Sequence, residues 1–226
     1  MSRKGPLGIF GGTFNPVHNG HLRSALEVRE SLGLEQVLLV PAAEPPLRAA
    51  PECSAALRAE LVELAVATEP GLACDSRELD RPGPSYTVDT LAELRAEQGS
   101  ERSLCLIVGT DILENLDRWH RWEELLSLAH LVVMARPGWQ HPQSGTVATW
   151  LDAHRGENVD LLHQQASGAV FLQTLRQLPI SATEIREMIG AGRSPRYLVP
   201  DAVWEKIQLS GAYGGAQPQQ EQHGIC

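Results

Sequence analysis

The sequence predicts an α/β protein with a single Rossmann-like, doubly wound domain, in which a mostly parallel sheet carries helices on both faces. Short continuous apolar runs, typical of buried parallel strands, alternate with amphipathic helical segments along the whole chain. Two of these runs break abruptly at glycines, as strands do at the carboxyl edge of an open α/β sheet. The chain has 226 residues, enough for one such domain with a buried core.

Six apolar runs are expected to form the sheet. The first ends at two glycines, and the second ends at Pro41, whose ring cannot continue a strand ladder. The fourth run, residues 104–108, is the most apolar and is expected at the centre of the sheet. The expected strands are residues 7–10, 37–40, 72–74, 104–108, 131–135 and 170–173.

Helical segments separate these runs. The first, residues 20–33, places apolar side chains on successive turns and ends at Gly33, which suits a helix C-terminus. Ser54, Thr87 and Ser181 are each expected to cap the start of a helix, because their side chains accept a hydrogen bond from the first turn. The other expected helices are residues 55–65, 88–98, 149–154, 183–189 and 201–209, with two short helical pieces around Trp119 and Trp122.

Composition excludes several classes of protein. The net charge of −9 argues against a nucleic-acid partner, which needs a basic face. No apolar run approaches the ~20 residues of a membrane-spanning helix, and no signal peptide is recognisable. The four cysteines are scattered without metal-ligand spacing. We therefore expect a reduced, cytoplasmic protein without a membrane or nucleic acid as its partner, and the composition leaves open whether it is a homo-oligomer.

The stretch IFGGTFNPVHNGHL, residues 9–22, carries the strongest functional pattern. Gly11 and Gly12 follow the first strand, where they let the backbone approach an anion. The helix that follows supplies unpaired N–H groups and the positive end of its dipole. His18 and His21 are three residues apart near its start, so both imidazoles can face one ligand. The pattern indicates a site for nucleotide phosphates.

Two other interpretations of the histidine pair were weighed. A metal site needs more ligands than two histidines, and no third ligand stands at helical spacing nearby. Two ordinary polar residues at a turn would explain a lone histidine. The glycines, Thr13 and the strand–turn–helix context together favour the phosphate site over both alternatives.

The stretch GGTFNPVHNGHL resembles the first signature of the nucleotidyltransferase superfamily that contains an HxGH element, and ISATEIR (residues 180–186) resembles its second, ISxTxxR. Within the superfamily the chain most resembles bacterial nicotinate-nucleotide adenylyltransferases, over residues 5–211. This resemblance implies transfer of the adenylyl group of ATP to nicotinate mononucleotide, which forms deamido-NAD and pyrophosphate in NAD biosynthesis. Residues 212–226 are polar and rich in helix breakers, and we expect a disordered tail there.

The resemblance also implies roles for individual residues. The catalytic residues would be His18, His21 and Arg186, with His21 nearest the α-phosphate. Mg²⁺ is expected to accompany ATP, held mainly by its phosphates rather than by a protein metal site. The expected ATP-binding residues are Gly11, Gly12, Thr13, Phe14, His18, His21, Arg23, Gly109, Asp111, Ile180, Ser181, Thr183 and Arg186.

Three further stretches are expected to select the second substrate. The segment PSYTVDTL, residues 84–91, resembles the family's PSYTxDTL segment, where a helix start lies against the pyridine carboxylate. Of the two tryptophans near residue 120, we expect Trp119 to stack on the pyridine ring and Trp122 to pack in the core. The expected mononucleotide-binding residues are Ala42, Tyr86, Thr87, Asp111, Trp119 and Arg136.

One loop departs from the family pattern, because Ala42 and Leu47 stand where asparagine and histidine are usual. This leaves nicotinamide mononucleotide open as the substrate. Another adenylyl- or cytidylyltransferase is disfavoured, because those families lack the PSYTxDTL-like segment and the paired tryptophans. A nucleotide-binding regulatory module without catalysis is disfavoured by the presence of both complete signatures.

Overall fold

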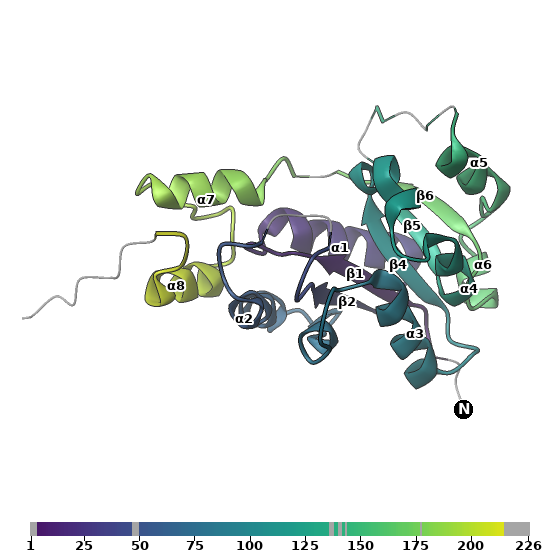
Figure 1. Ribbon diagram of the computed structural model, residues 1–226, viewed down its shortest axis with the longest axis horizontal. Helices are drawn as coiled ribbons and strands as arrows, with labels where there is room; N and C mark the ends of the chain where they lie inside the picture. Colours follow the sequence, from purple (N-terminus) through teal and green to yellow (C-terminus); the bar gives the residue numbers. More distant parts are fainter. Residues whose placement is uncertain are drawn as a thin grey trace, which may run out of the picture.

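The computed structural model describes residues 4–46, 50–135, 138–139, 142, 144–176 and 178–214. Its strands form one sheet in the order β3-β2-β1-β4-β5-β6, and every pairing is parallel (Figure 1). The expectation of a mostly parallel, doubly wound sheet is confirmed. The strands are β1 (Leu7–Gly12), β2 (Gln36–Pro41), β3 (Leu72–Cys74), β4 (Leu104–Gly109), β5 (His130–Ala135) and β6 (Val170–Thr174).

The strand order reverses direction between β1 and β4. From β1 the chain first builds outward through β2 to β3, and then returns to add β4, β5 and β6 on the other side. In an open parallel sheet, a crevice forms outside the carboxyl ends of the strands at such a switch point. Both Gly12 and Gly109 end the two strands that flank it.

Both faces of the sheet are covered, because alternate strand residues point to opposite sides. Leu7 and Ile9 belong to one apolar cluster, whereas Phe10 belongs to the other. Buried residues of α1, α2, α6, α7 and α8 pack with Phe10, and those of α3, α4, α5 and η2 pack with Leu7 and Ile9. The helices are α1 (Asn19–Leu32), α2 (Ala55–Val66), α3 (Thr87–Gln98), α4 (Leu125–Leu128), α5 (Thr146–Ala153), α6 (Leu161–Gln164), α7 (Ala182–Gly190) and α8 (Asp201–Ser210).

Short 3₁₀ helices complete the fold: η1 (Arg77–Leu79), η2 (Thr110–Arg118), η3 (Trp122–Glu124) and η4 (Ala212–Gly214). At one end of the molecule, opposite α5, α8 lies beside α2 and α7 lies above α8 in the view of Figure 1. Among the described residues, no helix combines the length and apolar character needed to cross a bilayer.

Of the three side-chain N-caps that the sequence predicts, the structure contains one. Ser54 caps α2 as expected, because its Oγ accepts a hydrogen bond from the Leu57 N–H at 3.2 Å. Thr87 is not a cap: Tyr86 is the N-cap of α3, and it makes no side-chain capping bond. Ser181 is the N-cap of α7, yet its hydroxyl makes no capping bond either. The helix expected at residues 149–154 starts earlier, at Thr146.

Contacts continue just beyond residue 211, the expected end of the domain. Residues 212–214 form η4, and the Tyr213 hydroxyl donates to Asn15 Oδ1 at 2.8 Å. The same hydroxyl lies 2.9 Å from Cys53 Sγ. These contacts join Tyr213 to the turn that follows β1, so η4 packs with the rest of the domain. The rest of the expected tail, residues 215–226, lies outside the described residues.

Candidate active site

A cleft of about 1310 Å³ opens at the carboxyl ends of β1 and β4, at the switch point of the sheet. Its volume exceeds the roughly 300–1,000 Å³ of an ordinary small-molecule pocket, so the cleft is larger than a pocket for one small ligand needs to be. The cleft collects residues from both ends of the chain. The predicted site residues that line it are Gly11, Gly12, Thr13, Phe14, His18, His21, Ala42, Tyr86, Thr87, Gly109, Asp111, Trp119, Ile180, Ser181, Thr183 and Arg186.

His18 and His21 form a reciprocal cap at the start of α1. The His21 N–H donates to His18 Nδ1, and the His18 N–H donates to His21 Nδ1, each at 3.3 Å. The two rings stack with their centroids 3.6 Å apart. Because each Nδ1 accepts a hydrogen bond, each neutral ring carries its proton on Nε2. The cap therefore fixes the tautomer of both imidazoles and makes each Nε2–H a donor.

Close packing holds this pair in place. A side chain at position 20 would bring its Cβ within 2.9 Å of His18 Nδ1, which is why only glycine fits between the two histidines. The Phe14 ring lies edge-on against His21, with centroids 5.1 Å apart. Phe14 is buried and takes a left-handed backbone conformation with φ of 46°. The orientation of His21 is thus set by its neighbours before any ligand binds.

Burial keeps His18 neutral. Its residue is only 5 % exposed, and burial lowers the pKa of His18 from 6.5 to about 4. At neutral pH the ring therefore acts as an uncharged hydrogen-bond donor rather than as a cation. An uncharged ring at this position can donate a hydrogen bond to a ligand oxygen without first taking up a proton from solution.

The lowered pKa predicts an acid-dependent loss of stability. Between pH 6.5 and about 4 the unfolded imidazole binds a proton while the folded one does not, so the free energy of unfolding falls as the pH falls. Within that window, His18 should lower the free energy of unfolding by about 1.4 kcal/mol for each pH unit of acidification. Above pH 6.5 the ring is neutral in both states, so His18 causes no such loss.

Urea unfolding of the wild type and of His18→Asn at pH 7 and pH 5 measures this slope. Asparagine is chosen because it retains an N-cap acceptor but cannot titrate. The variant should lose less stability than the wild type between the two pH values. An equal loss in both proteins would show that His18 does not titrate in this way.

Arg186 projects from α7 into the same part of the cleft. Its Nη1 donates to the Asn15 carbonyl at 2.9 Å, and its Nε lies 2.9 Å from Glu52 Oε1. Its Nη2 lies 3.5 Å from Thr183 Oγ1. The Asn15 side-chain amide also donates to Glu52. In the cleft, the Glu52 carboxylate thus pairs with the guanidinium of Arg186, the last residue of the second signature.

Two helix starts border the cleft without side-chain caps. These are the starts of α3 at Thr87 and of α7 at Ala182, and residues of both line the cleft. The first N–H groups of a helix need acceptors, and their dipole favours an anion. The two missing caps therefore leave positions suited to anionic groups of a ligand.

The far end of the cleft is aromatic. The rings of Tyr86 and His120 lie against each other with centroids 4.3 Å apart. Trp119 lines the cleft, whereas Trp122 packs against Trp150 with centroids 5.1 Å apart. Both tryptophans are half-buried against the same apolar cluster, so the expected stacking role of Trp119 stays a prediction.

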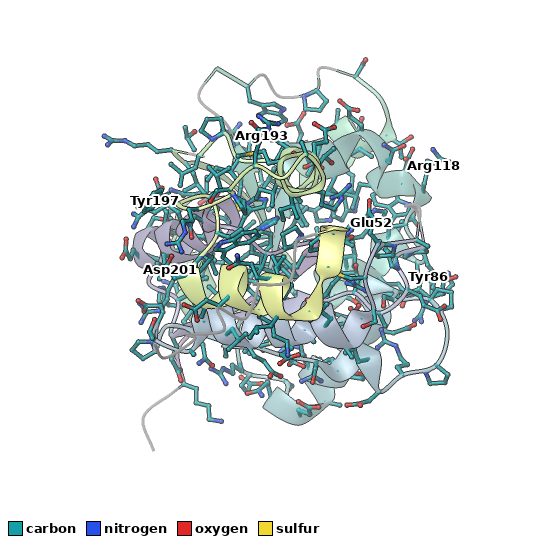
Figure 2. All side chains as sticks on the ribbon, turned by 90° about the vertical axis from the view of Figure 1, so that its left-hand side faces the viewer. Glu52, Tyr86, Arg118, Arg193, Tyr197 and Asp201 are labelled. Carbon is teal, nitrogen blue, oxygen red and sulfur yellow. The ribbon has the colours of Figure 1, made fainter. Side chains whose placement is uncertain are left out.

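One cleft connects the surroundings of Glu52 and Tyr86. In Figure 2, Glu52 lies right of the centre, and Tyr86 and Arg118 lie farther out on the same side. All three residues line the same cleft. The Arg186 guanidinium, which pairs with Glu52, and the Tyr86 ring therefore border one continuous surface.

Known proteins are similar to this chain over nearly its whole length. The cytidylyltransferase-like family model matches residues 9–188. A probable nicotinate-nucleotide adenylyltransferase of Cellvibrio japonicus is 53% identical over 207 residues, covering 92% of this chain and 98% of that protein. One of Aeromonas hydrophila is 47% identical over 210 residues, covering 93% and 98%. The chain belongs to the nicotinate-nucleotide adenylyltransferase family.

The fold agrees with a solved structure. The nicotinic acid mononucleotide adenylyltransferase of Plasmodium falciparum, complexed with NaAD, has a TM-score of 0.68 to this chain. The match covers 94% of this chain and 98% of that one, at 12% sequence identity. At that identity the likeness concerns the fold, which this chain shares with a member of the nicotinate-nucleotide adenylyltransferases.

Two expected site residues of this adenylyltransferase are not placed in the cleft. Arg23 does not line it: its guanidinium lies 3.8 Å from Glu27 and 3.5 Å from Glu30 on α1. The ion pairs turn this side chain along its own helix, so the structure does not support the expected ATP contact. Arg136, like Leu47 of the proline-rich loop, lies outside the described residues.

Several residues of the cleft were not singled out from the sequence. Glu52 and Ser85 line it, and Arg58 and Tyr213 hold the loops around it. Glu78 also lines it, buried beneath the Thr90 hydroxyl, which donates to its Oε1 at 2.6 Å. Nothing local in the sequence marks these residues, because their hydrogen-bond partners lie twelve or more positions away.

Proposed function

We propose that this protein transfers the adenylyl group of ATP to nicotinate mononucleotide, forming nicotinate adenine dinucleotide and releasing pyrophosphate. The observation that carries the proposal is that one cleft contains both signatures of the family. His18 and His21 follow β1, Arg186 lies 165 positions after His21 in α7, and all three line that cleft. Family membership supplies the identity of the two substrates.

In this reaction a phosphate oxygen of the mononucleotide attacks the α-phosphorus of ATP, and the bond from that phosphorus to the β-phosphate oxygen breaks. The attacking phosphate is already an anion, so no general base is required. Catalysis consists of holding two polyanions in line and stabilising the charge on the five-coordinate phosphorus and the leaving pyrophosphate. The fixed Nε2–H donors of His18 and His21 suit that task.

The remaining donors suit the triphosphate. The uncapped start of α7 presents backbone N–H groups, and Arg186 offers a guanidinium whose fork matches phosphate oxygens. Mg²⁺ would enter as part of MgATP. Among the residues that the structure describes, no group of three metal-binding side chains is found. Magnesium commonly keeps its waters and substrate phosphates as ligands, so such a group is not required.

The aromatic end suits the pyridine nucleotide. Trp119 lines the cleft where a flat ring can stack, and the uncapped start of α3 favours a carboxylate. A nicotinamide ring has a neutral amide in place of that carboxylate. The first turn of α3 therefore favours nicotinate over nicotinamide mononucleotide.

Pyrophosphate release from ATP, measured with each mononucleotide, tests the proposal. We expect release that depends on both Mg²⁺ and nicotinate mononucleotide, with a higher kcat/KM for nicotinate than for nicotinamide mononucleotide. Release without any mononucleotide, or none with either one, would contradict adenylyl transfer. A preference for nicotinamide mononucleotide would overturn the substrate assignment alone.

A further inference from the structure

Arg58 is a fully buried guanidinium beneath the cleft. The residue lies in α2 and is 1 % exposed. Its Nη1 donates to the Thr13 carbonyl at 2.7 Å, and its Nη2 donates to the Ala43 carbonyl at 3.1 Å. Thr13 follows β1 and Ala43 follows β2, so one side chain bridges the loops after two adjacent strands.

These two loops face different substrates in the proposed reaction. The loop after β1 continues into His18 and His21, and the loop after β2 leads toward Ser85 and the start of α3. Ser85 Oγ accepts a hydrogen bond from the Ala43 N–H at 2.9 Å, and the Ser85 N–H donates to the Glu44 carbonyl at 3.0 Å. Arg58 therefore sits at the junction between the phosphate end and the pyridine end of the cleft.

The loop after β2 is held from three sides. The Ala42 N–H donates to the Gly12 carbonyl at 2.9 Å. Arg58 donates to the Ala43 carbonyl, and the Ala43 N–H donates to Ser85 Oγ. All of these contacts use backbone atoms of residues 42–44. Alanine at position 42 is therefore compatible with an ordered loop, even though asparagine is usual there in the family pattern.

Arg58 is a large and fully buried side chain, so a replacement has to keep its volume. No carboxylate pairs with Arg58 among the described residues, and its buried Nε has no hydrogen-bond partner there. Burial also lowers the pKa of Arg58, although a guanidinium stays charged at neutral pH. Methionine is unbranched and adaptable, so it can fill most of the same space. It removes both hydrogen bonds to the loops and leaves the Thr13 and Ala43 carbonyls without this donor.

We propose that Arg58 is a positioning residue, which sets the separation of the two substrate-binding loops and thereby the approach of the mononucleotide phosphate to the α-phosphorus. The inference rests on the proposed function. Arg58 touches no substrate itself, because it does not line the cleft and its Nη1 and Nη2 donate to carbonyl oxygens beneath it. Its effect should fall on the alignment of bound substrates more than on the binding of either one.

The test compares Arg58→Met with Arg95→Met. Arg95 is a matched control: burial lowers its pKa too, and it donates to the carbonyls of Leu128 and Ala166, both away from the cleft. For each variant we would measure Tm, kcat, and the Kd of ATP and of nicotinate mononucleotide separately, the latter by quenching of tryptophan fluorescence. All assays run well below the Tm of the variant.

For Arg58→Met we expect kcat to fall by about 10²-fold, because a shift of about 1 Å in approach costs that much, with each single-substrate Kd changed by less than roughly threefold. Arg95→Met should lower Tm while leaving kcat within about twofold of the wild type. Arg58→Lys retains one donor and should recover part of kcat, and it serves as the test if Arg58→Met does not fold.

Three outcomes would overturn the inference. The first is a wild-type kcat in Arg58→Met or Arg58→Lys. The second is a loss of kcat in Arg95→Met equal to that in Arg58→Met, which would mean a general effect of destabilisation. The third is weaker binding of only one of the two substrates, with kcat unchanged. A wild-type protein inactive with both mononucleotides would instead sink the proposed function, so the two failures are distinguishable.

Discussion

Replacing His21 with alanine is expected to lower kcat by roughly 10²–10³-fold, the usual cost of losing one transition-state donor. The reason lies in the reciprocal cap, where the His21 Nδ1 accepts the His18 N–H and the ring carries its proton on Nε2. Stacking on His18 and edge-on contact with Phe14 fix the ring in place. A preorganised donor of this kind stabilises charge that develops on the α-phosphate.

The measurement is steady-state pyrophosphate release at saturating substrates, with circular dichroism to check folding. His163→Ala is the matched control, because that histidine lies exposed on α6 and does not line the cleft. The His21 variant should keep its fold and bind ATP, while the control keeps its kcat. Turnover close to the wild type in His21→Ala would remove this ring from the chemistry.

Replacing Arg186 with lysine is expected to lower kcat/KM for ATP by about 10–100-fold, because a point charge cannot reproduce a bidentate fork and a hydrogen bond to a charged group is strong. In the structure this guanidinium binds the Asn15 carbonyl and pairs with Glu52. The triphosphate must therefore compete with a carboxylate for it. Glu52→Gln, which removes that competing charge, should lower the KM for ATP.

Weaker use of ATP in Arg186→Lys together with a lower KM for ATP in Glu52→Gln would identify Arg186 as the phosphate-binding group. If the ion pair were purely structural, both substitutions would weaken it and both would change the kinetics with ATP in the same direction. Arg193→Lys is the control, since Arg193 is exposed and does not line the cleft (Figure 2). Unchanged kinetics in Arg186→Lys would count against the second signature as a clamp on ATP.

The strands and the class of the fold were predictable because their signals are local. A strand buried on both faces must be apolar at nearly every position, so runs such as residues 104–108 can be found without knowing their neighbours. Each of the six expected strands overlaps a strand of the sheet. The expected bounds of β3 are those observed, and the bounds of the other five strands shifted by one or two residues. A strand ends where its ladder partner ends rather than where the apolar run stops.

Helix caps were less predictable. Thr87 and Ser181 have side chains that favour N-caps, yet neither makes a capping bond. Ser85 lies two residues before Thr87, and its N–H donates to the Glu44 carbonyl. The helix α3 begins after Tyr86, which is its N-cap. Both helix starts border the cleft, and there the tertiary position of the backbone overrides the local preference of one side chain.

The sequence by itself determined the order of strands and helices, the phosphate-binding pattern after β1, and the resemblance of both signatures to one family. Each depends on residues close together in the chain. Only the tertiary structure decided that Glu52 pairs with Arg186, that Tyr213 closes on Asn15, and that Arg58 joins two loops. These contacts join residues far apart in sequence, and hydrogen bonds that depend on the meeting of separate loops leave no periodic trace in the chain.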